Sequence, residues 1–116
     1  MSISFKGYGE NVLTFNSKAS KIGVPVRIDE DREVREASAE NDFIGVTSSI
    51  DGKMAGVIMD GYVELPYTGN KPTYSYCYLV ANGSGGVKMP ASGTTSNHIV
   101  RVLTVDTENK IVGFIL

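Results

Sequence analysis

The chain has 116 residues and a mass of 12.5 kDa, the size of one domain. Hydrophobic residues make up 41% of the chain and 13 glycines accompany them, so the composition is globular and not that of a disordered protein. Eleven Lys and Arg against thirteen Asp and Glu give a net charge of −2, without the basic excess that nucleic acids or anionic membranes attract. The single cysteine excludes an internal disulfide framework and a thiolate zinc site.

Neither a secretion signal nor a membrane span is visible in the sequence. Residues 1–7 contain no apolar run of signal-peptide length. The longest run of apolar residues and glycine, 111–116, is far shorter than the roughly 20 residues that cross a bilayer. We therefore expect a soluble protein made and kept in a cytoplasm.

The first 42 residues divide by charge. Four Lys and Arg stand against one Glu in residues 1–28, whereas seven acids stand against two arginines in residues 29–42. Such a pair of segments either mediates contacts between copies or forms a solvated loop or edge. Strands are predicted at 12–15 and 24–28. Because residues 1–21 otherwise show little periodicity, we expect a flexible N-terminal arm there and a single β domain over residues 22–116.

The acidic segment has two interpretations. Residues 30–40 are good helix formers with Asp29 as a cap, but only Val34, Ala37 and Ala39 offer an apolar surface. We favour a short strand around Val34 followed by a loop, with a helix as the alternative. Its carboxylates lack the glycine and glutamate spacing of an EF-hand, so calcium at residues 29–33 would be incidental.

From Phe43 onward the sequence alternates with period two, as β-strands do. Residues 44–50 lead to Asp51-Gly52, a dipeptide typical of hairpin turns. Residues 54–65 form the clearest run, in which Gly61 predicts a bend or bulge at a barrel corner. Pro66 and the Gly- and Pro-containing segment 68–72 end this run.

The last third continues in the same manner. Residues 74–81 place Tyr74, Tyr76 and Tyr78 on one face and Cys77 on the other. A glycine-rich turn over 82–86 leads to a short strand at 87–89, and a polar loop follows. Strands at 98–105 and 111–116 predict a terminal hairpin that is central in the fold. Short strands with short links predict an all-β fold, a small antiparallel β-barrel or sandwich with the extended N-terminal arm.

No motif in the chain indicates catalysis. His98 is the only histidine and has no partner at metal-ligand spacing, and Cys77 lies in mid-strand, where a buried thiol is the ordinary state. Residues 82–88 match neither phosphate-binding template, because a strand and Pro90 follow where a helix is needed. We expect no enzyme, no catalytic residue, no metal and no cofactor.

Tyrosines form the most specific local feature. Tyrosine combines a large apolar ring with a polar tip and is enriched in protein interfaces, although such rings also pack inside folds. Without a basic groove, stacking on nucleic acid is not expected. We predict an interface at five tyrosines: Tyr62, Tyr67, Tyr74, Tyr76 and Tyr78. The apolar residues of the arm form a second predicted contact: Ile3, Phe5, Tyr8, Val12 and Phe15.

Several segments recur in a fixed order. They are Gly23-Val24-Pro25-Val26, Asp42-Phe43-Ile44-Gly45-Val46, the stretch from Asp60 to Tyr67, Gly85-Gly86-Val87 and Val112-Gly113-Phe114-Ile115-Leu116. As an ordered set over residues 22–116, they resemble small β-proteins encoded beside the major capsid protein in tailed phages and prophages of Gram-positive bacteria. Those proteins are regarded as head decoration, or cement, proteins.

This resemblance implies a binding protein. Decoration proteins are compact, often trimeric subunits that sit outside the assembled head and clamp adjacent capsid subunits. The resemblance implies a homotrimer on the virion surface, made in the bacterial cytoplasm, with the major capsid protein as partner and neither nucleic acid nor a membrane. It further implies that residues 1–21 bind the shell. The alternative is a carbohydrate- or surface-binding module of a head fibre or baseplate.

Overall fold

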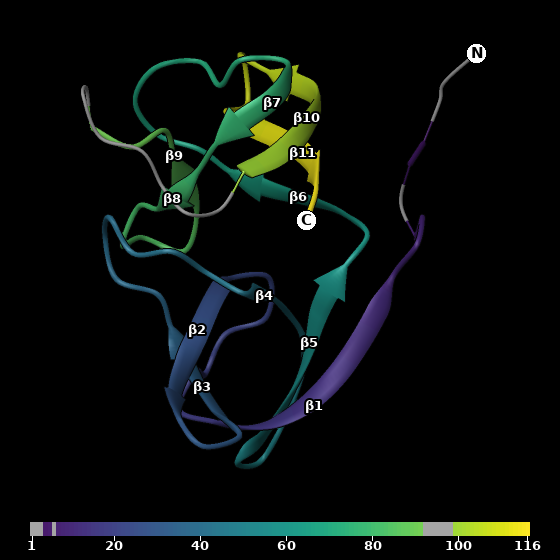
Figure 1. The fold of residues 1–116 in the computed structure, drawn as a ribbon, viewed down its shortest axis with the longest axis vertical. Helices are drawn as coiled ribbons and strands as arrows, with labels where there is room; N and C mark the ends of the chain where they lie inside the picture. The colour runs from purple at the N-terminus through teal and green to yellow at the C-terminus, as the bar shows by residue number, and fades with distance from the viewer. Residues whose placement is uncertain (1–3, 6, 92–98) are drawn as a thin grey trace.

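The computed structural model describes residues 4–5, 7–91 and 99–116, and within these ranges every regular element is a strand. The fold is all-β, as predicted, and has two consecutive halves (Figure 1). The strands of the first half are β1 (Asn11–Ser17), β2 (Pro25–Glu30), β3 (Glu33–Glu36), β4 (Gly45–Asp51) and β5 (Met54–Asp60). Those of the second half are β6 (Tyr62–Pro66), β7 (Ser75–Tyr78), β8 (Val80–Ala81), β9 (Val87–Lys88), β10 (Ile99–Asp106) and β11 (Ile111–Ile115).

The first half closes into a five-stranded barrel in the order β1-β3-β2-β4-β5. Four of its pairs are antiparallel, but β1 and β3 run parallel, joined at Asn16↔Glu33 and Ser17↔Val34. The prediction of purely antiparallel pairing is wrong at this one joint. The physical reason is that β2 lies between β1 and β3 in the chain, and it supplies the long crossover that parallel strands need.

Part of the expected N-terminal arm, residues 11–17, is a strand of the barrel. Residues 11–17 form β1, which pairs with β5 from Asn11↔Asp60 to Asn16↔Met54. Val12 and Phe15 are therefore in the barrel wall, and Phe15 packs against the barrel core. The strand predicted at 12–15 is confirmed as part of β1, but its partner β5 follows some 40 residues later, and local periodicity does not show such a pairing.

Gly61 separates the two halves, and it confirms the predicted bend. Its φ of +109° turns the chain out of β5 and into β6. A Cβ at this position would lie 2.6 Å from the carbonyl oxygen of Tyr8 and 2.8 Å from Cα of Glu10, because the N-terminal segment crosses directly over it. Glycine is therefore required for both conformation and space.

The second half is a four-stranded antiparallel sheet in the order β6-β11-β10-β7, with the β8–β9 hairpin beside it. The terminal hairpin β10–β11 is central in this sheet, as predicted. At the tip of the β8–β9 hairpin, Asn82 Oδ1 accepts hydrogen bonds from the backbone N–H groups of Ser84 and Gly86. This glycine-rich segment is thus a turn, as the sequence analysis favoured.

Two apolar cores lie side by side, and the larger one joins the halves. The barrel core contains Val26, Val34 and Val57, all of zero exposure. The core beneath the four-stranded sheet also receives Phe43 and Val46 from the barrel half, and Phe43 meets Phe114 edge to face with centroids 6.3 Å apart. Residues 33–36 form β3, so the alternative helix is not formed.

Candidate functional site

The outer face of the four-stranded sheet, turned away from the core, carries one row of large side chains. The strand register sets Tyr76 on β7 opposite Arg101 on β10, Arg101 opposite Ile115 on β11, and Ile115 opposite Tyr62 on β6. Directly paired residues lie on the same face of a sheet. Tyr62 and Tyr76, 14 residues apart in the sequence, therefore stand at opposite ends of this row.

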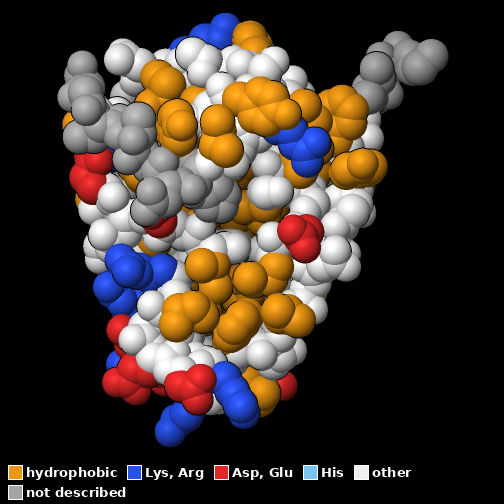
Figure 2. Space-filling view, in the orientation of Figure 1, with side chains coloured by type: hydrophobic (Ala, Val, Ile, Leu, Met, Phe, Trp, Pro, Cys, Tyr) orange, Lys and Arg blue, Asp and Glu red, His pale blue; other side chains and the backbone are white. Residues whose placement is uncertain are grey.

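Large apolar side chains are exposed at the β7 end of the row. Tyr76 is 69% exposed and Tyr78 40%, while Cys77 between them is buried, which fits the predicted alternation. Their neighbours Ile99 and Leu103 on β10 are 47% and 39% exposed. We call these four exposed residues, together with Arg101, the outer patch. Figure 2 shows apolar side chains gathered over this sheet.

Tyr74 is 54% exposed but lies just before β7. Ser75 has a φ of +66°, so the extended backbone does not continue through it. The ammonium group of Lys71 lies 4.9 Å from the centre of the Tyr74 ring. Tyr74 thus holds a cation at the margin of the outer patch.

Two of the five predicted interface tyrosines are buried in the structure, so they do not form a free surface. Tyr67 is 2% exposed and packs in the core beneath the sheet, where its hydroxyl has no partner among the described residues. Tyr62 is 4% exposed although it lies on the outer face. Sequence alternation predicts which face a residue occupies, but not whether another segment covers that face.

The segment that covers Tyr62 is the chain's own N-terminus. The Phe5 ring meets Tyr62 edge to face at 5.5 Å between centroids, and the backbone N–H of Tyr62 donates to the carbonyl oxygen of Tyr8 at 3.1 Å. A shallow apolar pocket of about 230 Å³ remains between this segment and the sheet, lined in part by Leu103 and Ile115. Phe5 and Tyr8 keep 38% and 65% exposure, whereas Ile3 lies outside the described residues.

Tyr62 is held by polar contacts as well as by its cover. Its hydroxyl donates to Oε2 of Glu64 at 2.8 Å and shares a hydrogen bond of 3.1 Å with Oγ1 of Thr104. The ring lies over Gly113, where any Cβ would collide with the Tyr62 hydroxyl. Burial, together with the neighbouring Glu64 carboxylate, raises the pKa of the Tyr62 phenol, so the hydroxyl stays protonated and remains a donor.

The outer patch is positively charged in a protein whose net charge is −2. The ion pairs in the described part of the chain use Lys18, Arg35 and Lys88, and leave Arg101 and Lys71 without an acidic partner there. Glu64, the acid on the same face, lies at the β6 end and is engaged by Tyr62. The β7 end of the face is therefore both apolar and basic.

Charge is distributed differently on the barrel. Acidic and basic side chains gather around the far end of the barrel, away from the four-stranded sheet (Figure 2). There Lys18 lies 2.7 Å from Asp29 and 3.4 Å from Glu33, and Arg35 lies 3.3 Å from Asp29. The hydrogen bond from Lys18 lowers the pKa of Asp29, and the same contact raises the pKa of Lys18. Here Asp29 and Glu33 of the acidic segment are paired with basic side chains of the same barrel.

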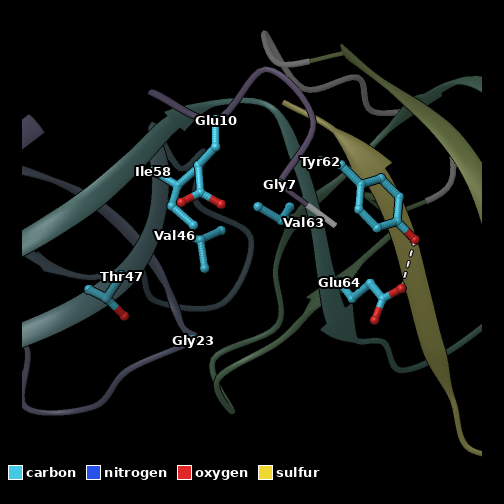
Figure 3. A pocket seen from close by; sticks show the side chains of 9 residues that line it. All are labelled: Gly7, Glu10, Gly23, Val46, Thr47, Ile58, Tyr62, Val63 and Glu64. Atoms are coloured by element: carbon cyan, nitrogen blue, oxygen red, sulfur yellow. Dashed lines mark hydrogen bonds between the residues drawn. The ribbon is translucent and has the colours of Figure 1, made fainter. Parts of the chain in front are cut away.

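A second cavity, of about 320 Å³, lies where the halves meet (Figure 3). Val46, Ile58 and Val63 form its apolar floor, and the carboxylates of Glu10 and Glu64 stand at separate sides. The buried hydroxyl of Thr47 beside it already donates to the carbonyl oxygen of Lys21. The cavity thus offers no unpartnered buried group to hold a ligand.

Of the two residues considered for chemistry, Cys77 and His98, the structure describes only Cys77. Cys77 is 4% exposed, and its thiol points to the carbonyl oxygen of Tyr78 at 3.5 Å. His98 lies outside the described residues. Within the described ranges, no three His, Cys, Asp or Glu side chains are grouped to hold a metal ion.

The sequence analysis did not identify Ile99, Arg101 and Leu103 as surface residues. The residues at 98–105 are mostly apolar, which indicated a central strand but not which face stays uncovered. The signal that was available is the placement of Arg101 between apolar neighbours, since an arginine within a central strand must point to solvent or to a partner.

A scan against models of protein families finds no matching family, and a search of curated proteins finds no match to this chain. No helix in the described part of the chain is long and apolar enough to cross a membrane.

Proposed function

We propose that this chain is a capsid decoration protein of a tailed phage or prophage, a non-enzymatic virion component that binds the outside of the assembled head. The observation that carries this proposal is the outer patch, where exposed Tyr76, Tyr78 and Ile99 surround Arg101. Clusters of exposed aromatic residues and arginine are typical of the centres of protein interfaces. The ordered segments resemble decoration proteins, and this resemblance implies that the partner is the major capsid protein.

The proposed mechanism is multivalent clamping. A trimer of this chain presents three outer patches, and once one patch is bound the others act at a high effective concentration. Because the trimer binds adjacent subunits of the assembled shell and not separated subunits, occupancy stabilises the shell. Its place is the virion surface, after synthesis in the bacterial cytoplasm. This mechanism needs no cofactor.

The test is binding to shells assembled from the adjacent major capsid protein and lacking this chain. We expect the protein to co-sediment with the shells and to raise the temperature at which they disrupt. Tyr76→Ala should weaken binding by about 1–2 kcal/mol per site, roughly tenfold, because it removes a central aromatic anchor. Ile22→Ala is the matched control, since Ile22 is similarly exposed, at 62% against 69% for Tyr76, but lies before β2.

Three outcomes separate the alternatives. No co-sedimentation and unchanged shell stability would reject the decoration proposal. Sugar binding on a glycan array that is lost in Tyr76→Ala would favour the carbohydrate-binding module instead. Light scattering measures the trimer directly, and a protein that stays monomeric both free and on shells would remove the multivalent mechanism.

A further inference from the structure

The two edges of the four-stranded sheet are treated differently. At the β6 edge, the N–H of Tyr62 donates to the carbonyl oxygen of Tyr8 at one end, and the N–H of Thr68 donates to that of Val87 just past the other end. A parallel bridge joins Tyr67 to Val87 at the same place. The chain therefore contacts both ends of this edge with other segments of its own backbone.

The β7 edge has no such cover among the described residues, because β7 is the last strand in the sheet order and pairs there with β10 alone. Proteins usually shield an edge with charges, proline, a bulge or a covering segment. Residues 75–78, Ser-Tyr-Cys-Tyr, contain neither a charge nor a proline, and the pairing with β10 is regular. Among the described residues, the shortness of the strand is the one usual safeguard that this edge has.

We propose that the β7 edge binds an extended segment of the partner protein by strand addition. The inference rests on the proposed function and specifies how the capsid protein is held. The opposite end of the sheet shows that this face accepts a neighbouring segment: the carbonyl oxygen of Tyr8 accepts a hydrogen bond from the N–H of Tyr62, and the Phe5 ring lies against Tyr62 on the outer face. A partner segment along β7 would extend the same face at its opposite end.

The side chains on the outer face of the sheet indicate which residues a bound partner segment should carry. Alternate side chains of an added strand would project beside Tyr76 and Tyr78, and an apolar group is buried best beside Tyr78, which pairs with Ile99. Two strand spacings, about 10 Å, separate the new strand from β10, a distance that a glutamate and an arginine side chain span together. An acidic residue beside Tyr76 would therefore pair with Arg101, which has no acidic partner in the described part of the chain.

The N-terminal segment of a second copy is a poor candidate to bind along β7, because its charge has the same sign as that of the outer patch. Residues 4–8 of this chain, Ser-Phe-Lys-Gly-Tyr, include a lysine and no acid, and would meet Arg101 and Lys71 with like charge. Tyrosines beside cations also suit single-stranded nucleic acid. We favour a peptide segment, because the unpaired backbone groups of an edge strand are satisfied by another backbone.

The first experiment is hydrogen–deuterium exchange on the full chain, free and bound to shells of the adjacent capsid protein. We expect the amides within 75–78 to exchange at least tenfold more slowly when bound. The same segment of Tyr76→Ala, at matched shell concentration, should show less protection, and Ile22→Ala should behave as the unchanged protein. Binding that leaves the 75–78 amides unprotected would overturn strand addition while the decoration proposal stands. Absence of binding would reject the decoration proposal itself.

The second experiment uses overlapping 12-residue peptides that cover the same capsid protein. We expect a small set of bound peptides that share alternating apolar residues and an acid. Methylating alternate backbone nitrogens of a bound peptide should cost at least tenfold in affinity in one of the two registers, whereas side-chain docking alone would be indifferent to register. Replacing its acid by lysine should weaken binding to this chain but not to Arg101→Gln. A 12-nucleotide oligo(dT) that binds more tightly than every peptide would overturn the inference in favour of nucleic acid.

Discussion

The barrel and the four-stranded sheet differ in whether the charged side chains on their surfaces are paired. The barrel end carries most of the clustered charge, and Lys18, Asp29, Glu33 and Arg35 neutralise one another there. The sheet leaves Arg101 without an acidic partner in the described ranges, beside exposed Tyr76. Side chains that already pair with one another gain little from a partner protein, whereas an apolar surface with an unpaired cation gains more. The outer face of the sheet is therefore the better candidate for a partner-binding surface.

The largest effect is expected in the core that the barrel and the sheet share, because this core tests whether the two halves unfold separately. Phe114→Ala should lower the free energy of unfolding by about 3–5 kcal/mol, because it empties the centre of the core that Phe43 enters from the barrel half. Chemical denaturation followed by circular dichroism measures the loss. We expect one transition for both halves, and two separate transitions would mean that the halves fold independently.

The junction between the halves gives the next largest effect. Gly61→Ala should cost about 2–4 kcal/mol, since a Cβ there meets backbone atoms of Tyr8 and Glu10 and the φ of +109° strains any other residue. Gly69→Ala is the control: its φ is +77°, but no atom lies within 4 Å of the added Cβ. An equal decrease in the free energy of unfolding for the two variants would show that the backbone of Tyr8 and Glu10 moves aside at little cost.

Two buried tyrosines sharpen the comparison within the sheet. Tyr62→Phe should destabilise the protein by about 1 kcal/mol, because Glu64 and Thr104 lose a hydrogen-bond partner. Tyr67→Phe should be neutral or stabilising, because the Tyr67 hydroxyl is buried without a partner among the described residues. Thermal unfolding of both variants side by side checks this, and the reverse order would contradict the contacts described for either hydroxyl.

The smallest effect concerns the charges on the barrel. A carboxyl whose pKa is lowered by folding binds fewer protons when folded, so Asp29 adds stability above its ordinary pKa, near 4, and this is lost as pH falls through the lower folded value. Lys18, whose pKa is raised, adds stability that is fully present below 10.5 and is lost above it. Asp29→Asn should slightly flatten both limbs of the stability–pH curve. An unchanged acid limb would show that the Lys18 contact is not maintained in solution.

Much of the fold followed from local patterns in the sequence. The alternation over 54–65 and the break at Gly61 predicted β5, β6 and the bend between them. The apolar stretches at the C-terminus predicted the central hairpin. These features are local, because strand faces and turns depend on neighbouring residues.

What could not be predicted was contact between distant segments. The sequence predicts a strand at 12–15, but nothing near Asn11–Ser17 indicates that β5 and β3 are its partners, so a place in the barrel is not predicted. Likewise, Tyr62 and Tyr76 have similar surroundings in the sequence, yet Phe5 covers only Tyr62. Of the candidate site, the sequence identified exposed Tyr74, Tyr76 and Tyr78, but the pairing that sets Arg101 beside Tyr76 required the strand register.

The order of the halves along the chain has a consequence for folding during synthesis. Residues 11–60 contain every strand of the barrel, so the barrel can pair before the ribosome has made the sheet. Phe5 and Tyr8 find their contacts only when Tyr62 and its strand exist. They therefore precede the barrel along the chain but reach their final position after it, when the first strand of the sheet has been made.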